Sequence, residues 1–286
     1  MADQRLQTFT LNFPDLLAEP QGTMAIEVYA AGVDPNGRQL FGVPDPSDVE
    51  LIHHNFQVPF WRDVRSRDRM DPRMQQSAIL AQERDYGRGA KKGLGDRLNA
   101  FANSAAQSGK PELSVLELGC ADGATLRHLK KYAPDVSVDF FGLEMTDFLV
   151  DHLLFKNKDV RAIVGGADEF LKMGGPEFGA DEFDIFIASG VLCQIPPGLA
   201  RDVIRHAASF CDHVYMWDYL FNLNGDVSET DCVIFKLTET HEHILYLNPY
   251  ERFLREAGFT NIDIVLSDGQ NPEMPFQEGC LFASKP

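Results

Sequence analysis

The feature that most constrains the fold of this chain is a regular alternation of short apolar stretches with helix-forming segments, which begins near residue 113. Such an alternation predicts a mostly parallel sheet with helices on both faces, because parallel strands need long crossover connections. The predicted strands are 114–118, 136–143, 160–164, 183–188, 213–219, 261–266 and 279–284. The predicted fold class is therefore α/β, with a doubly wound, mostly parallel seven-stranded sheet.

Helices are predicted between these strands. Thr146 is the expected N-cap of one helix, and Asp147 in its first turn suits the helix dipole. Asn248 and Pro249 predict another helix start, with Asn at the cap and Pro at the first helical position, and Gly258 predicts its end. The predicted helices are 124–132, 147–156, 168–173, 199–210 and 248–257.

The chain before residue 113 has a different, irregular pattern with many turn signals. The stretches 24–31 and 39–43 flank the turn sequence Asp-Pro-Asn-Gly at 34–37, which predicts a β-hairpin. A helix is expected at 93–102, leading into the alternating region. We therefore divide the chain into an irregular α+β N-terminal extension, residues 1–84, and a main domain, residues 85–286. The extension is expected to serve as a substrate or lid region, or in oligomerisation.

Composition limits the partners of the protein. The formal net charge of −17 disfavours nucleic acid and anionic membrane surfaces, because phosphate binding needs a basic face. The five cysteines are widely spaced and form no CxxC pair, so they predict neither a disulfide framework nor a zinc site, and no metal is predicted as a cofactor. The sequence contains no signal-peptide pattern and no apolar run long enough for a membrane span, and we expect a cytoplasmic protein.

A glycine loop lies where the first predicted strand of the sheet turns into a helix. In open α/β sheets, ligands bind outside the carboxyl ends of the strands. Gly119 and Gly123 allow a tight turn and a close backbone approach to a ligand. Glu117 is positioned to accept a hydrogen bond from an ammonium group. The second strand ends at Glu144, whose carboxylate can accept both hydroxyls of a ribose, and Met145 offers an apolar contact for a purine.

The residues between the two glycines argue against a dinucleotide. A pyrophosphate-binding loop has the pattern G-x-G-x-x-G, whereas here three residues separate Gly119 from Gly123. Nothing basic adjoins Cys120, so this thiol is expected to be a small packing residue rather than a reactive group. Asp122 is expected to cap the helix that follows it.

The sequence Glu-Leu-Gly-Cys-Ala-Asp-Gly at 117–123 resembles motif I of class I S-adenosylmethionine-dependent methyltransferases, whose pattern is E/D-x-G-x-G-x-G. The middle glycine is replaced by Ala121 here. The resemblance implies a Rossmann-like fold, methyltransferase activity and S-adenosylmethionine as cofactor. The residues that it places around the methionine part of the cofactor are Glu117, Gly119, Cys120, Ala121 and Gly123.

Further positions carry the resemblance along the chain. It implies that Glu144 takes the ribose hydroxyls and that Met145 contacts the adenine. The loop 166–169 resembles the family's loop after the third strand, where an acid meets the adenine amino group. Asp168 is the first choice for this acid and Glu169 the second.

The end of the fourth strand and the region before motif I complete the expected cofactor site. The stretch 185–195 resembles the family's fourth-strand motif, so Ser189 is expected to border the cofactor. Family members often carry a histidine near the positions of Cys193 and Gln194, and here it is missing. Tyr86 and Arg88 are expected at the cofactor carboxylate, as in similar enzymes.

The last part of the chain also matches the family. The helix at 248–257, the pair Gly258-Phe259 and the strand 279–284 resemble the family's closing helix, its Ala-Gly-Phe turn and its terminal antiparallel strand. Dinucleotide dehydrogenases lack this ending.

Methylation of an oxygen acceptor usually needs a base, and histidines are the candidates. His241 and His243 are two residues apart, so they would share one face of a strand, within the segment 221–247 that is too long for an ordinary loop. His53 and His54 are second candidates. For His241 and His243 the alternatives are plain surface residues and a metal-binding pair, although no third ligand with convincing spacing is evident. The nearby Trp61 would line an acceptor pocket or pack the extension onto the main domain.

We therefore predict a methyltransferase for a small-molecule acceptor, with oxygen as the first choice and a sugar or secondary metabolite as the substrate. The alternatives are N- or C-methylation of a small molecule or a protein, a dinucleotide oxidoreductase, and a non-catalytic or other-chemistry protein that binds the cofactor. Amino-methylating enzymes often carry Asn/Asp-Pro-Pro-Tyr after the fourth strand, and Ser-Gly-Val-Leu at 189–192 does not match it. A homodimer is compatible with the sequence, and neither nucleic acid nor a membrane is an expected partner.

Overall fold

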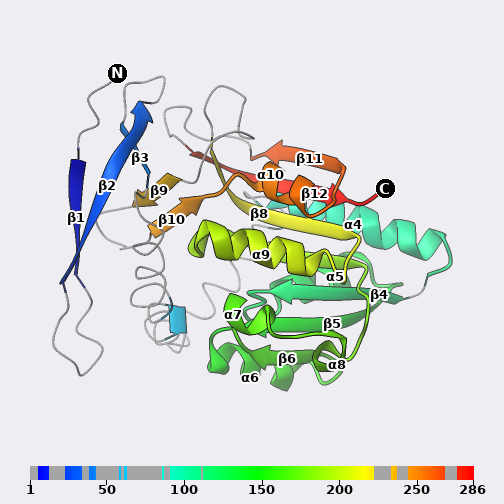
Figure 1. The fold of residues 1–286 in the computed structure, drawn as a ribbon. Coiled ribbons are helices and arrows are strands. Elements are labelled where there is room, and N and C mark those ends of the chain that lie inside the picture. The colour runs from blue at the N-terminus through cyan, green and yellow to red at the C-terminus, as the bar shows by residue number, and fades with distance from the viewer. Residues whose placement is uncertain are drawn as a thin grey trace.

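In the computed structural model, the described residues form two β-sheets (Figure 1). The larger sheet has seven strands in the order β11-β12-β8-β7-β4-β5-β6, and the smaller sheet has five, in the order β1-β2-β3-β9-β10. The residues that the structure describes are 6–12, 23–33, 39–42, 58, 61–62, 86, 91–110, 112–221, 233–236, 244–267 and 276–286.

The seven-stranded sheet confirms the predicted fold class. β4 pairs in parallel with β5 and β7, and these pair in parallel with β6 and β8. β12 lies between β8 and β11 and is antiparallel to both, so it is the single antiparallel strand of this sheet. The strands are β4 (Glu112–Leu118), β5 (Ser137–Glu144), β6 (Arg161–Val164), β7 (Ile185–Ser189), β8 (His213–Phe221), β11 (Asn261–Leu266) and β12 (Phe276–Ser284).

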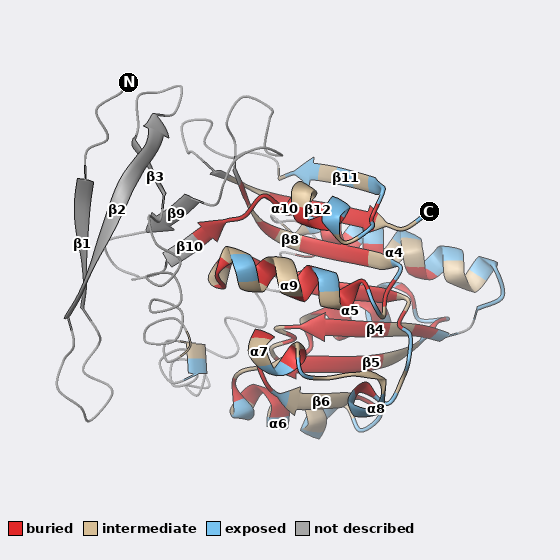
Figure 2. Ribbon diagram, in the orientation of Figure 1, coloured by how far each residue is buried: buried red, intermediate tan, exposed pale blue. Residues whose placement is uncertain are grey.

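Helices cover both faces of this sheet because its central strands bury apolar side chains on both sides. In β4, Leu116 and Leu118 belong to one hydrophobic core and Val115 to the other, since successive strand residues point to opposite faces. Figure 2 shows β4 buried over most of its length. The described helices are α4 (Lys92–Gln107), α5 (Ala124–Tyr132), α6 (Asp147–Lys156), α7 (Ala167–Phe170), α8 (Gly175–Phe178), the 3₁₀ turn η3 (Leu192–Gln194), α9 (Pro197–Ala207) and α10 (Tyr250–Glu256).

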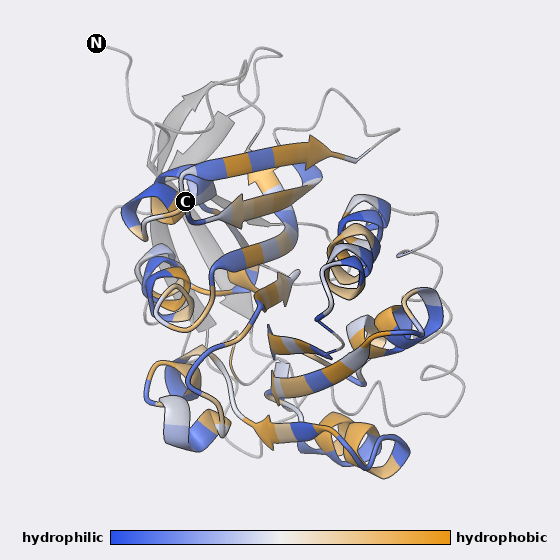
Figure 3. Cartoon of the chain, turned by 90° about the vertical axis from the view of Figure 1, so that its right-hand side faces the viewer, coloured by the Kyte–Doolittle hydropathy of each residue, from blue (hydrophilic) through white to orange (hydrophobic). Residues whose placement is uncertain are grey.

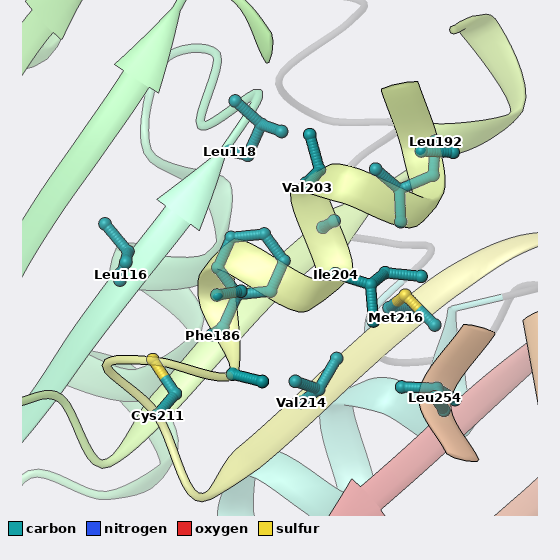
Figure 4. Packing of buried hydrophobic residues seen from close by; sticks show 14 of the residues in the cluster. Leu116, Leu118, Phe186, Leu192, Val203, Ile204, Cys211, Val214, Met216 and Leu254 are labelled. Carbon is teal, nitrogen blue, oxygen red and sulfur yellow. The ribbon is translucent and has the colours of Figure 1, made fainter. Parts of the chain in front are cut away.

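The two cores hold different helices. One core joins α9 and α10 to the sheet, and in Figure 4 Ile204 of α9 and Leu254 of α10 pack near Val214 of β8. The other core joins α4 and α5, through residues such as Leu98 and Leu126. Figure 3 shows apolar residues concentrated on the strands and hydrophilic ones along the outer sides of the helices. This is the layered arrangement of a doubly wound fold.

One predicted helix cap is confirmed in position only, and the other is wrong. Thr146 occupies the N-cap of α6, but its side chain makes no capping hydrogen bond, and its hydroxyl instead donates to the carbonyl oxygen of Trp61 at 3.5 Å. Pro249, rather than Asn248, is the N-cap of α10. The Asn248 side-chain amide donates to the carbonyl oxygen of Leu192 at 2.9 Å. This residue is distant in sequence, and the bond replaces the capping bond that the local sequence predicted.

The smaller sheet joins the two regions of the chain that are hardest to interpret from sequence. It consists of β1 (Leu6–Asn12), β2 (Thr23–Val33), β3 (Gln39–Gly42), β9 (Val233–Lys236) and β10 (Ile244–Leu247). β2 and β3 pair antiparallel, which confirms the predicted hairpin. β3 pairs with β9 through Gly42 and Val233, so the extension and the segment 221–247 form one sheet. The domain division at residue 84 stays a prediction.

None of the described helices has both the length and the apolar character needed to cross a bilayer.

Candidate functional site

A cavity of about 250 Å³ opens at the carboxyl ends of the parallel strands. Its wall is built by the residues that follow or end β4, β5, β6 and β7, with Trp217 from β8. This is the position at which open α/β sheets bind ligands. The described lining residues are Val58, Trp61, Tyr86, Lys91, 117–121, Ala124, 144–146, 165–167, 189–191, Gln194, Ile195 and Trp217.

Glu117 is the most unusual residue in this wall. It lies near the end of β4 and is only 3% exposed. Its Oε1 accepts a hydrogen bond from the Thr125 hydroxyl at 2.7 Å, while its Oε2 is buried and has no hydrogen-bond partner among the described residues. Burial is the main reason that the pKa of Glu117 rises to about 8, and the nearby Glu144 and Asp122 raise it further. A buried carboxylate oxygen without a donor is costly unless a ligand supplies one.

Tyr86 lies behind Thr125 and extends the same chain of hydrogen bonds. Its phenolic oxygen is 2.8 Å from the Thr125 hydroxyl, and both side chains are buried. Burial and the nearby Glu117 raise the pKa of Tyr86 well above its usual value, so the phenol remains protonated. Tyr86 also lines the cavity, and its contact with the cofactor carboxylate stays a prediction.

Glu144, at the end of β5, holds the glycine loop through its carboxylate. Oε2 accepts a hydrogen bond from the Ala121 amide at 3.0 Å, and Oε1 accepts one from the Thr146 amide at 3.1 Å. Ala121 has a φ of +47°, the only positive φ of a non-glycine residue among those described. This left-handed conformation costs an L-residue about 1–2 kcal/mol. Ala121 thus keeps the backbone shape for which the motif I pattern uses glycine.

The two flanking glycines have different roles. Gly119 lines the cavity with a φ of +74°, and a Cβ there would lie 2.3 Å from Cγ2 of Val191. Gly123 does not line the cavity. It is the N-cap of α5 with a φ of +84°, and a Cβ there would lie 2.6 Å from Cδ1 of Leu153. Both positions therefore need glycine, one for the cavity wall and one for helix packing.

The side chains of Cys120 and Asp122 both have partners within the protein. Cys120 is buried, and a Cβ at Gly142 would lie 2.5 Å from its sulfur, so it fills the space that the glycine leaves. Burial raises the pKa of its thiol well above the usual value, as expected for a packing residue. The prediction that Asp122 caps α5 is wrong, because this helix has no side-chain cap. Asp122 instead forms an ion pair with Arg127, at 3.1 Å.

The loop after β6 presents backbone rather than acid side chains to the cavity. Gly165, Gly166 and Ala167 line it, whereas Asp168 and Glu169 are not among the lining residues. The Glu169 carboxylate accepts a hydrogen bond from the Gly166 amide at 2.8 Å, and this bond is the main cause of its lowered pKa. Met145 lies at this side of the cavity, with its side chain against Gly166.

The end of β7 and the turn after it form the next part of the wall. Ser189, Gly190 and Gln194 line the cavity there. Asp218 of β8 holds this turn from behind, because its Oδ2 accepts hydrogen bonds from the Cys193 amide at 3.0 Å and the Tyr250 hydroxyl at 2.9 Å. Asp218 is completely buried, and burial raises its pKa to about 6.

Lys91 and Trp217 are two of the lining residues that sequence reasoning missed. The ammonium of Lys91 lies 4.7 Å from the ring centroid of Trp217 and 5.8 Å from that of Tyr86, which makes a cationic corner beside Glu117. The indole Nε1 of Trp217 is buried without a hydrogen-bond partner among the described residues. Nothing in the sequence indicates that Lys91 lines a cavity whereas the adjacent Lys92 forms an exposed ion pair with Asp96. Trp61 does line the cavity, one of its two predicted roles.

Several predicted residues lie outside the described part of the chain. They are the four candidate bases, His53, His54, His241 and His243, and Arg88, which was predicted at the cofactor carboxylate. Among the described residues, no three His, Cys, Asp or Glu side chains gather into a group that could hold a metal ion.

Comparison with known proteins supports an assignment at the level of the fold. No protein-family model matches the sequence, and no curated protein does. The structure of 1,6-didemethyltoxoflavin-N1-methyltransferase from Burkholderia thailandensis, with 1,6-didemethyltoxoflavin and S-adenosylhomocysteine bound, superposes with a TM-score of 0.51 at 15% identity, covering 91% of this chain and 95% of that one.

Two further solved structures are similar. Magnesium protoporphyrin IX methyltransferase from Synechocystis PCC 6803, with S-adenosylmethionine bound, has a TM-score of 0.49 at 14% identity, over 85% of this chain and 99% of that one. The N-terminal domain of EvdMO1, with S-adenosylhomocysteine bound, has a TM-score of 0.48 at 17% identity, over 67% and 81%. The Burkholderia structure carries the assignment: this chain has the fold of the class I S-adenosylmethionine-dependent methyltransferases.

Proposed function

We propose that this protein is an S-adenosylmethionine-dependent methyltransferase that acts on a small molecule. The observation that carries the proposal is the buried Oε2 of Glu117, which has no donor among the described residues and belongs to a cavity wall at the carboxyl ends of the strands. An ammonium group, such as that of the methionine part of the cofactor, would supply the missing donor in a charge-assisted hydrogen bond.

The rest of the cavity wall fits the other parts of this cofactor. Lys91 would take the carboxylate, because it is the cation next to Glu117, and Tyr86 would lie beside this carboxylate while its phenol donates to Thr125. Glu144 would accept the ribose hydroxyls. Each of its oxygens already accepts one amide hydrogen, but a carboxylate oxygen has room for a second donor. Met145 and the backbone of 165–167 would contact the adenine, with Asp168 or Glu169 near its amino group.

The chemistry asks little of the protein beyond positioning. The bound cofactor supplies an electrophilic sulfonium methyl group. The chain would hold the acceptor in line with it and exclude water, which is the main contribution that a protein makes to such a displacement. Val58 and Trp61 lie at the cavity, so the N-terminal extension contributes to its wall and would contribute to the acceptor site.

We propose an oxygen atom as the acceptor, with a sugar or secondary metabolite as substrate and His241 or His243 as the base, or else His53 or His54. Attack by a hydroxyl needs its proton removed, and histidine is suited to this near neutral pH. Methylation of nitrogen is the second candidate, and it is favoured by the Burkholderia enzyme, an N1-methyltransferase. A small acceptor rather than nucleic acid is supported by the net charge of −17.

Calorimetric titration tests the cofactor. The protein should bind S-adenosylhomocysteine and not NADH. Glu117→Gln should weaken S-adenosylhomocysteine binding by roughly 10- to 100-fold, the effect of losing a hydrogen bond to a charged group. Glu112→Gln is the matched control, because Glu112 is exposed at the far end of the same strand. Tight binding of NADH, or equal affinities of Glu117→Gln and the wild type, would contradict the proposal.

A transfer assay then tests the reaction. Methyl-labelled S-adenosylmethionine is incubated with panels of hydroxylated and amine-bearing small molecules, and labelled product is separated from the cofactor. Label on hydroxylated acceptors supports O-methylation, label on amines alone supports the second candidate, and binding without transfer to any acceptor would favour a non-catalytic protein.

A further inference from the structure

We propose that Thr125 is a positioning residue: its hydroxyl holds the Glu117 carboxylate so that Oε2 is left for a cationic group of the ligand, and Tyr86 holds the hydroxyl of Thr125 in that direction. The inference deepens the proposed function and rests on it only for the choice of ligand.

The direction of the hydrogen bonds follows from the number of protons available. The Thr125 hydroxyl has one proton, which it donates to Oε1 of Glu117 at 2.7 Å. The Thr125 oxygen therefore accepts at its other contact, and the Tyr86 phenol, 2.8 Å away, is the donor. The chain runs from Tyr86 through Thr125 to Glu117, and each hydroxyl fixes the orientation of the next group.

The surroundings explain why this chain is needed. The terminal torsion of a glutamate is broad, so an unrestrained carboxylate would turn easily. Thr125 lies in the first turn of α5 and is completely buried, so it comes from a rigid element. The other charged or titratable groups that act on Glu117 are Lys91, Glu144 and Asp122. The two acids disfavour its ionised form, which Lys91 and the Thr125 hydrogen bond favour.

The experiment compares two ligands on matched variants. Thr125→Val removes the hydroxyl and keeps the shape, whereas Thr125→Ser keeps the hydroxyl. S-adenosylhomocysteine carries the ammonium group, and 5′-methylthioadenosine lacks it while retaining the adenine and ribose. We expect Thr125→Val to lower the affinity for S-adenosylhomocysteine about tenfold and to leave the affinity for 5′-methylthioadenosine within about twofold of wild type. Thr125→Ser should keep both affinities near wild type.

A second variant and a second readout protect the test from a folding defect. Tyr86→Phe removes only the phenol that donates to Thr125. It should lower the affinity for S-adenosylhomocysteine about threefold and leave the affinity for 5′-methylthioadenosine unchanged. In a ¹³C NMR titration of the free protein, Thr125→Val should raise the pKa of the Glu117 carboxyl, because a hydrogen bond to the ionised form is lost, and Thr125→Ser should not.

The outcomes separate this inference from the proposed function. Equal weakening of both ligands by Thr125→Val, or unchanged binding of S-adenosylhomocysteine, overturns the positioning role. If the wild-type protein binds neither ligand, the proposed cofactor is wrong. The NMR titration then decides the role of Thr125 alone: a raised Glu117 pKa supports it, and an unchanged one overturns it.

Discussion

The carboxylate of Glu144 accepts a hydrogen bond from the amide of Ala121, at 3.0 Å, and so joins the end of β5 to the left-handed residue of the loop after β4. One side chain thus supports the loop that walls the cavity and is proposed to bind the ribose. Removing it should affect both the shape of the site and its affinity.

Glu144→Ala should therefore weaken S-adenosylhomocysteine binding by about 1–3 kcal/mol, because the ribose hydroxyls and the Ala121 amide lose their acceptor. Calorimetry measures the loss. Asp151→Ala, on the exposed side of α6, is the control and should have no effect. An unchanged affinity of Glu144→Ala would show that the ribose lies elsewhere.

Glycine substitutions should separate steric clash from backbone strain. Gly119→Ala introduces both effects, because its Cβ would lie 2.3 Å from Val191 and its φ is +74°. It should lower the free energy of unfolding by about 2–4 kcal/mol. Gly109→Ala has open space but a φ of +80° and should cost about 1–2 kcal/mol. Gly198→Ala, in α9 with open space, should stabilise by roughly 0.5–1 kcal/mol. Urea denaturation measures all three, and a different order would refute the steric explanation.

The affinity for S-adenosylhomocysteine should increase with pH up to about 8. Glu117 has a pKa of about 8 in the folded protein and 4.5 as its ordinary value, so the free site is protonated at neutral pH. An ammonium ligand needs the ionised form, and binding at pH 7 should release about one proton per ligand. Calorimetry in buffers of different ionisation enthalpy counts the protons. Glu117→Gln should abolish the release, and its persistence in this variant would assign it to another group.

The raised pKa of Glu117 also makes the stability of the ligand-free protein depend on pH. The direction of this dependence is opposite to that of an ion-paired acid, whose pKa is lowered on folding. The folded state keeps the Glu117 proton between pH 4.5 and about 8, whereas the unfolded chain has lost it. The contribution of Glu117 to stability therefore falls as the pH rises through this window and is constant above it. The difference in unfolding free energy between wild type and Glu117→Gln, followed by urea denaturation from pH 5 to 9, should decline in this range, and a rising difference would contradict the assignment.

Tyr250→Phe should destabilise the protein by about 1–3 kcal/mol. The phenol donates to the fully buried Asp218, and its loss leaves a carboxylate oxygen with one donor fewer. Tyr132→Phe is the matched control, because Tyr132 is 46% exposed. Thermal unfolding of the two variants is compared, and equal melting temperatures would argue against the buried network.

Sequence predicts best where the signal is local. The helix 124–132 and the strand 261–266 have the predicted bounds, because apolar spacing and turn residues mark both of their ends. Thr146 is the predicted N-cap but makes no capping bond, and Asn248 is not the N-cap, since their side chains bond to Trp61 and Leu192, which are distant in sequence. A capping rule considers only neighbours in the chain.

The candidate site shows the same division. Glu117, Gly119 and Glu144 were found from the strand ends and the glycine spacing, and all three line the cavity. Lys91 and Trp217 were missed, because a lysine before a helix and a tryptophan within a strand look ordinary until the sheet brings them together. The pairing of β3 with β9 could not be predicted from sequence either, since nearly two hundred residues separate Gly42 from Val233.

The place of β12 between β8 and β11 also determines when the large sheet can be completed during synthesis. β11 pairs only with β12 in this sheet, yet β12 is made after it. While residues 276–284 are still inside the ribosome, β11 has no neighbour and β8 has an open edge with unpaired backbone groups. A growing chain of this kind exposes a strand edge that other chains can pair with, so stalling or truncation before residue 276 would favour aggregation.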